Sequence, residues 1–200
     1  MFPLEQPIVP GGIVPLHIFE PRYRTLAHDL SEMAEPEFGT VGITRGREVG
    51  GADARADIGV VARVLRLESV PDGRWSLVAG ATRRIRIDAW LEAEPYPRAL
   101  VHDWPDPFDP DLDAAVPALQ RAVGRLVAAA RKQRPTVEIT MPDADPDDAG
   151  RTIWQLIDFA GLGPLDRLDL LACEDAATRA AEAARLISDR ADVLDALGDD

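Results

Sequence analysis

Cysteine and lysine are nearly missing from this 200-residue chain, which holds one of each, Cys173 and Lys132. A single cysteine cannot form an internal disulfide, which fits a reducing cytoplasm. No apolar run approaches the roughly 20 residues that cross a bilayer, and the N-terminus lacks the basic and apolar segments of a signal peptide. We therefore expect a cytoplasmic protein without a membrane span, and the preference for arginine over lysine is typical of a GC-rich bacterial genome.

Motifs of common catalytic and nucleotide-binding sites are absent as well. There is no G-x-x-x-x-G-K-[ST] loop and no G-x-G-x-x-G, and no serine sits in a G-x-S-x-G elbow. The three histidines, His17, His28 and His102, fall in a predicted strand, helix and strand, with no sign that they converge. Cys173 lies in a predicted apolar helix, where we expect a buried structural thiol. The sequence predicts no catalytic residue, no cofactor and no enzyme activity.

Positive charge is also scarce, since the net charge is −13. Residues 1–104 hold 12 basic and 15 acidic residues (−3), and residues 105–200 hold 10 and 20 (−10). Affinity for nucleic acid depends largely on neutralising phosphates, so an acidic chain is a poor candidate for that partner. Hydrophobic residues make up 46%, which predicts a folded chain.

The first half of the chain reads as β-structure. Residues 13–19, 39–46, 58–70, 74–80 and 98–104 have the β-branched residues or the alternation of strands. In "RRIRID", the isoleucines are expected on one face and Arg84 and Arg86 on the other. Pro71-Asp72-Gly73 predicts a hairpin turn. With one helix over 21–34, the pattern predicts a barrel-like or strongly curved sheet.

"WPDPFDPDLD", residues 104–113, contains three prolines and four aspartates and predicts a boundary between domains 1–104 and 105–200. Helical spacing follows over 112–134, with a late start or kink at Pro117. A second helix should start with Asp145 as its cap and Pro146 as its first residue, and end at Gly161 or Gly163. Two more helices are expected over 164–173 and about 175–197, the last capped by Asp175.

Two stretches resemble metal sites. In "PLHIFEPRYRTLAHD", His17 and Glu20 have the spacing of a ligand pair, but a third ligand is missing. We favour ion pairs between Glu20 and the arginines at a helix start, with packed aromatics and Pro21 as the first helical residue. "DADPDDAG" has the alternate aspartates of a calcium loop but lacks its glycine and glutamate. We interpret it as a helix-capping loop and predict no metal site.

Several segments together resemble the N-terminal substrate-binding domain of the ATP-dependent Lon proteases. They are "FPLEQPIVPGGIVPLHIFEPRYRTLAHD", "FGTVGITRGREVGG", "IGVVARVLRLESVPDGRWSLVAGATRRIRI" and "PYPRALV", followed by "FAGLGPLDRLDLLACEDAATRAAEAARLI". Their order and spacing match, and the match is strongest to the stand-alone bacterial version. The resemblance implies an α+β fold: a PUA-like six-stranded pseudo-barrel with one helix, then a helical bundle.

The resemblance also implies a role in holding unfolded or extended polypeptide without cutting it, because no ATPase motif or Ser-Lys dyad is present. Such a module could act as an adaptor or holdase with other protein-quality-control components. A concave surface between barrel and bundle, or a free sheet edge, would suit a peptide. The candidate peptide-binding residues are the aromatics Phe19, Tyr23, Trp75, Tyr96 and Trp104.

RNA binding is the alternative, because PUA-like folds are used for it elsewhere. Arg63, Arg66, Arg74 and the arginines of "RRIRI" could form a basic face on the strands. The net charge of −13 opposes this alternative.

Overall fold

The computed structural model describes residues 1–45, 54–92, 94–133 and 136–198. The chain divides into two compact units, Met1–Pro105 and Asp106–Asp200. Each unit is described below by itself, and the division into two independent domains stays a prediction. No helix in the described ranges is long and apolar enough to cross a membrane.

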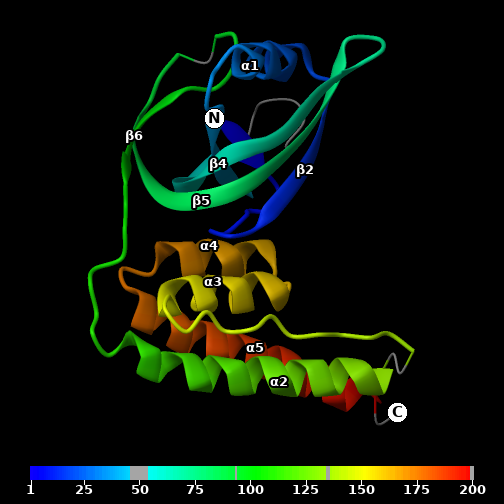
Figure 1. The fold of residues 1–200 in the computed structure, drawn as a ribbon, viewed down its shortest axis with the longest axis vertical. Helices are drawn as coiled ribbons and strands as arrows, with labels where there is room; N and C mark the ends of the chain where they lie inside the picture. Colours follow the sequence, from blue (N-terminus) through cyan, green and yellow to red (C-terminus); the bar gives the residue numbers. More distant parts are fainter. Residues whose placement is uncertain (46–53, 93, 134–135, 199–200) are drawn as a thin grey trace. The chain divides into compact units, whose positions relative to one another are not determined.

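The described part of the first unit forms one sheet of six strands with one helix (Figure 1). The helix is α1 (Pro21–Ser31), and the strands are β1 (Phe2–Leu4), β2 (Ile13–Ile18), β3 (Glu37–Arg45), β4 (Ala54–Val70), β5 (Arg74–Trp90) and β6 (Ala99–Asp103). The strand order is β1-β3-β4-β5-β2, and β6 also pairs with β5. Among the described residues, β1 pairs only with β3 and β2 only with β5, so the sheet is not closed. The α+β class and the six strands are confirmed. The strands do not close into a barrel, and the PUA-like character of the predicted pseudo-barrel stays a prediction.

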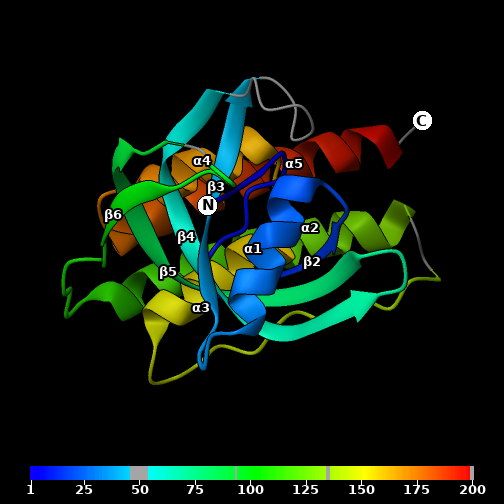
Figure 2. The ribbon, with the colours of Figure 1, turned by 90° about the horizontal axis from the view of Figure 1, so that it is seen from above.

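Strand β5 is the centre of this sheet. It pairs with β4 from Arg74 to Arg86, and its other edge pairs first with β2 and then with β6. The sequence pattern predicted separate strands in this region, because the alternation is interrupted where the neighbour on that edge changes. The long, strongly curved β4–β5 pair is visible in Figures 1 and 2.

The predicted turn between β4 and β5 is confirmed. Val70 and Arg74 are paired across it, and the N–H of Gly73 donates to the carbonyl of Val70 at 3.2 Å. Asp72 and Gly73 both have positive φ, 82° and 76°. Glycine and aspartate accept this conformation more readily than most residues, so the local sequence determines the hairpin.

Helix α1 begins at Pro21, as predicted, and packs on the sheet through one apolar stripe. Tyr23, Leu26, Ala27 and Leu30 are buried. The ring of Tyr23 stacks on Phe2 with centroids 4.2 Å apart, and burying such a side chain stabilises the fold by about 1.5–3 kcal/mol. The helix was predicted over 21–34 but ends at Ser31, and Met33 beyond its end is 50% exposed.

The arginines of "RRIRID" lie on the same side, as alternation predicts, but they do not form an exposed basic face. Arg84 is buried with only 4% of its surface exposed, and Arg86 is half-buried. Both guanidinium groups lie over the ring of Trp104, 4.3 and 3.8 Å from its centroid. Cation–π stacking compensates for part of the lost hydration of a guanidinium. The local pattern could not predict this contact, because Trp104 lies 20 positions after Arg84.

In its described residues, the second unit has four α-helices and a short 3₁₀ helix, η1 (Leu112–Ala115). The α-helices are α2 (Val116–Gln133), α3 (Ala149–Phe159), α4 (Pro164–Ala172) and α5 (Ala176–Gly198), which confirms the predicted number. Helices α2 and α5 run side by side in the same direction (Figures 1 and 2). Their C-terminal halves are joined by the pairs Arg125–Asp192 and Lys132–Asp195. Pro117 is the second residue of α2, which confirms the late start.

Two details of the helix ends differ from prediction. Helix α3 begins at Ala149, because Asp148 accepts the N–H of Arg151 at 2.8 Å. Asp145 instead accepts the N–H of Asp147, so it was wrong as the cap, although the loop does cap the helix. Cys173 follows the end of α4 in an extended conformation and is half-buried, so the expected helical, buried position was wrong. The caps predicted at Asp175 and Gly161 are confirmed.

A fully buried arginine, Arg179 of α5, joins the parts of the second unit. Its guanidinium donates to both carboxylate oxygens of Asp106, at 2.8 and 2.6 Å. It also donates to the carbonyls of Leu170 and Cys173 and lies over the ring of Trp154, 4.1 Å from the centroid. A buried charge needs this many partners, because its hydration is lost.

We expect Asp106→Ala to destabilise the second unit by about 3 kcal/mol, because the Arg179 guanidinium then stays buried without its carboxylate. The matched control is Asp192→Ala, which removes an ion pair whose side chains are both more than half exposed. It should cost no more than about 1 kcal/mol. Urea unfolding followed by circular dichroism checks both values, and equal effects of the two variants would contradict the assigned role of Arg179.

Acid should weaken the first unit through Glu37. Burial alone would raise the pKa of Glu37, but hydrogen bonds from Arg83 and Arg63 outweigh burial and lower it below its ordinary value of 4.5. A carboxylate whose pKa falls on folding stabilises the protein above its unfolded pKa, and this contribution is lost as the pH falls through the folded pKa.

We therefore expect Glu37→Gln to be less stable than the unmodified protein at pH 7, by about 0.5–1 kcal/mol, because the arginines are partly exposed. The difference should shrink as the pH falls below 4.5. Glu68→Gln, which removes the exposed pair with Arg66, is the control and should change little at either pH. Urea midpoints across this pH range measure the effect, and a difference independent of pH would show that Glu37 acts by packing alone.

Candidate polypeptide-binding groove

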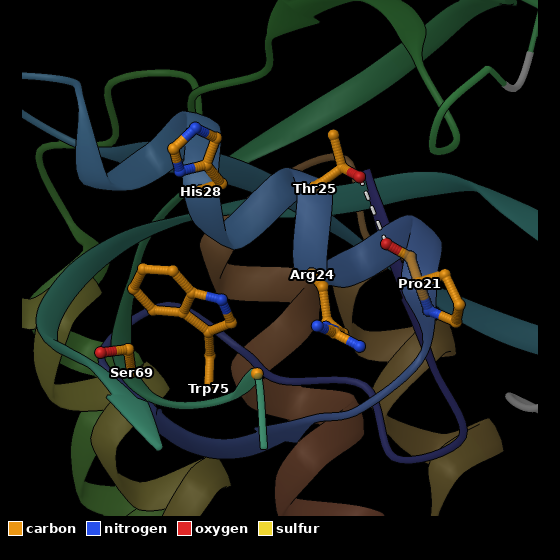
Figure 3. Close-up of a pocket in the computed structure, with 7 residues that line it drawn as sticks. Pro21, Arg24, Thr25, His28, Ser69 and Trp75 are labelled. Atoms are coloured by element: carbon orange, nitrogen blue, oxygen red, sulfur yellow. Dashed lines mark hydrogen bonds between the residues drawn. The ribbon is translucent and has the colours of Figure 1, made fainter. Parts of the chain in front are cut away.

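A groove of about 440 Å³ lies between α1 and the β4–β5 hairpin in the first unit (Figure 3). Its lining residues are Pro21, Arg24, Thr25, His28, Ser69, Gly73 and Trp75. A second hollow of about 300 Å³ shares Trp75 and is also lined by His17, Ile18, Phe19, Val70, Arg74 and Ser76. We call the two together the Trp75 groove.

Trp75 occupies the middle of this groove because of its place in the hairpin. It is the second residue of β5, directly after the turn, and it pairs with Ser69 of β4 and Ile18 of β2. Side chains alternate along a strand, so Trp75 lies on the same face as the buried Leu77. At the end of the hairpin this face is only partly covered, and Trp75 stays half-buried.

Phe19 comes to the same hollow from another part of the chain. It follows the last residue of β2, Ile18, which is the partner of Trp75 in the sheet. Its side chain is 55% exposed. Of the five aromatic residues that the sequence suggested, Phe19 and Trp75 are the two that the structure brings together.

The other three candidates have packing roles. Tyr23 is 1% exposed and stacks on Phe2. Trp104 lies under the guanidinium groups of Arg84 and Arg86. The hydroxyl of Tyr96 donates to Asp29 of α1 at 2.7 Å, and burial together with this carboxylate raises the pKa of Tyr96.

Sequence reasoning missed the polar side of the groove. Arg24 and His28 are four residues apart on α1, opposite the buried stripe, and both line the groove. Helical periodicity alone places them on one face, so the sequence contained this signal. Ser69 could not have been found in this way, because only the pairing of β4 with β5 brings it to Trp75.

The turn of the hairpin holds the guanidinium of Arg24 close to the groove. A Cβ atom at Gly73 would lie 2.1 Å from a terminal nitrogen of Arg24, so the guanidinium rests where any other residue would have its side chain. Arg74 pairs with Asp72 at 2.9 Å, and its hydrogen bond lowers the pKa of that carboxyl. The turn therefore holds Arg24 against the backbone of Gly73, and its Asp72 forms an ion pair with Arg74.

Among the described residues, the hydroxyl and imidazole groups that line the groove are not paired with one another. Ser69 and His28 both line it, but no serine hydroxyl in the described part of the chain is hydrogen-bonded to a histidine ring. Glu20 pairs with Arg22 at 3.1 Å, which is the ion pair expected at the start of α1. In the same part of the chain, no three His, Cys, Asp or Glu side chains gather as a metal site requires. The arrangement offers apolar contact, hydrogen-bond donors and positive charge.

Comparisons with known proteins agree with this architecture. Residues 1–189 match the family model of the ATP-dependent protease La (LON) substrate-binding domain. The chain is 26% identical over 193 residues to a Lon protease of Methylocella silvestris, covering 94% of this chain and 23% of that protein. It therefore spans about a quarter of the length of this curated relative.

Two solved structures have the same fold. A Lon N-terminal domain protein from Xanthomonas campestris has a TM-score of 0.63 at 23% identity, with 90% of this chain and 93% of that chain covered. The N-terminal domain of the Mycobacterium avium complex Lon protease has a TM-score of 0.61 at 18% identity, with 94% and 97% covered. Because the family model matches residues 1–189 of its 200, the chain belongs to the family of Lon substrate-binding domains.

Proposed function

We propose that this protein is a non-catalytic module that binds extended or unfolded polypeptide in the Trp75 groove. The observation that carries the proposal is the pairing of a half-buried tryptophan with an exposed phenylalanine in one groove, on a chain of the Lon substrate-binding family. An adaptor or holdase role in the cytoplasm, alongside other protein-quality-control components, is part of the same proposal.

The groove suits weak and permissive binding. Burying one large apolar side chain of a client on Trp75 and Phe19 contributes about 1.5–3 kcal/mol, part of which is lost in ordering the client chain. Such affinities suit a surface that takes many unfolded chains in turn. The contacts are mainly apolar, so many different large side chains of a client can make them.

The RNA alternative depends on a free basic face, and its arginines have other partners. Arg63 and Arg83 pair with Glu37, Arg66 pairs with Glu68, and Arg74 pairs with Asp72. Arg84 and Arg86 stack on Trp104. With a net charge of −13, no observation favours RNA over polypeptide.

We expect Trp75→Ala to weaken the binding of unfolded peptides by about fivefold or more, because the largest apolar surface of the groove is lost. Fluorescence anisotropy with labelled peptides from an unfolded protein measures the affinity. Trp90→Ala is the matched control, since Trp90 is also a partly exposed tryptophan of β5 and lies outside the groove, under Arg55.

Trp90→Ala should bind as the unmodified protein does, and circular dichroism of both variants verifies the fold. If no peptide binds the unmodified protein up to millimolar concentrations, polypeptide binding is excluded as the function. If Trp75→Ala binds as tightly as the unmodified protein, the site lies elsewhere.

A further inference from the structure

The lining of the Trp75 groove differs in charge from the rest of the molecule. The chain carries 35 acidic and 22 basic residues, but among the described residues no aspartate or glutamate lines either hollow of the groove. The titratable residues that line the groove are two arginines and two histidines: Arg24, Arg74, His17 and His28. The described lining of this groove therefore carries positive charge, although the chain as a whole is acidic.

Carboxylates near the groove have partners of their own. Asp72 pairs with Arg74 at 2.9 Å, and Glu32 lies 3.7 Å from His28. Arg24 is near enough to contribute to the lowered pKa of Asp72, but the ion pair is made by Arg74. Arg24 makes no ion pair with any residue in the described part of the chain, although its guanidinium is held against the turn at Gly73. The positive charge of Arg24 is therefore already held beside the groove and is available to a carboxylate of a client.

Arg24 and Trp75 face the same hollow from opposite elements. Figure 3 shows the side chain of Arg24 extending from α1 toward the hairpin, beside the indole of Trp75. A client side chain packed on Trp75 would bring the neighbouring client residues close to Arg24. A strand advances about 3.3 Å per residue, so a carboxylate within about two residues of the packed side chain can reach the guanidinium.

We propose that the Trp75 groove selects extended segments in which an aromatic or large aliphatic residue is followed within two positions by an aspartate or glutamate, whose carboxylate Arg24 binds. This inference rests on the proposed polypeptide-binding function and specifies its client. Trp75 and Arg24 line the same hollow, so a client side chain packed on the indole lies close to the guanidinium. This closeness favours a side-chain carboxylate within about two residues of the packed side chain.

The test uses acetylated and amidated peptides that are identical except for one residue, two positions after a phenylalanine: Asp, Asn or Lys. Their affinities for the full chain are measured by fluorescence anisotropy at low and at 0.5 M salt. We expect the Asp peptide to bind about two- to fivefold more tightly than the Asn peptide, as for a partly exposed ion pair, and the Lys peptide to bind most weakly. High salt should reduce the Asp–Asn ratio.

Arg24→Gln should bring the Asp–Asn ratio to about one, and this ratio, measured within the variant, is the readout. Arg66→Gln is the matched control, because Arg66 is an exposed arginine of β4 that lines a separate hollow, and it should keep the ratio. An Asn peptide with a free terminal carboxylate several residues away should gain nothing.

The outcomes separate this inference from the proposed function. If all peptides bind the unmodified protein equally, the inference is overturned and the polypeptide-binding function stands. If Arg24→Gln keeps the ratio, or the terminal carboxylate alone restores tight binding, the inference is also overturned. If none of the peptides binds, the proposed function itself fails.

Discussion

The pairing of β5 with three neighbours is the constraint on which the first unit depends. One edge of this strand is paired with β4, and the other is divided between β2 and β6. Because β2 leads directly into α1, its pairing with β5 also determines where the helix starts and which face it covers. Trp75 lines one hollow with Arg24 and another with Phe19 only because these strands are aligned, so both hollows are a consequence of the pairing.

The second unit depends on a different kind of interaction. Arg179 is fully buried, and its partners come from the chain before η1, from α3 and from the end of α4. Exposed pairs such as Arg125–Asp192 lie on the surface of the same helices and contribute little. The two kinds of ion pair differ in burial. When a buried charge loses its partner, no water reaches it and the charge stays uncompensated, whereas at the surface water takes the place of the lost partner.

Membership of the Lon substrate-binding family explains the architecture, and the local chemistry of the Trp75 groove makes the functional proposal specific. Two of the five aromatics suggested by sequence reasoning line it, and the other three pack against Phe2, Asp29 and a pair of arginines. Aromatic residues serve burial and recognition equally well, so residue type alone could not separate the two roles. Arg24 was within reach of sequence reasoning, because it lies opposite the buried stripe of α1.

Local signals in the sequence determined the elements that depend on neighbouring residues: the turn at Asp72 and Gly73, the start of α1 at Pro21, and the cap at Asp175. These signals act through backbone conformation and hydrogen bonds over a few positions, which a linear pattern records. Only the tertiary structure decided that the sheet stays open, that Arg84 is buried against Trp104, and that Phe19 and Arg24 each line a hollow with Trp75. Each of these depends on contacts between residues far apart in the chain, for which the local pattern of hydrophobicity carries no information.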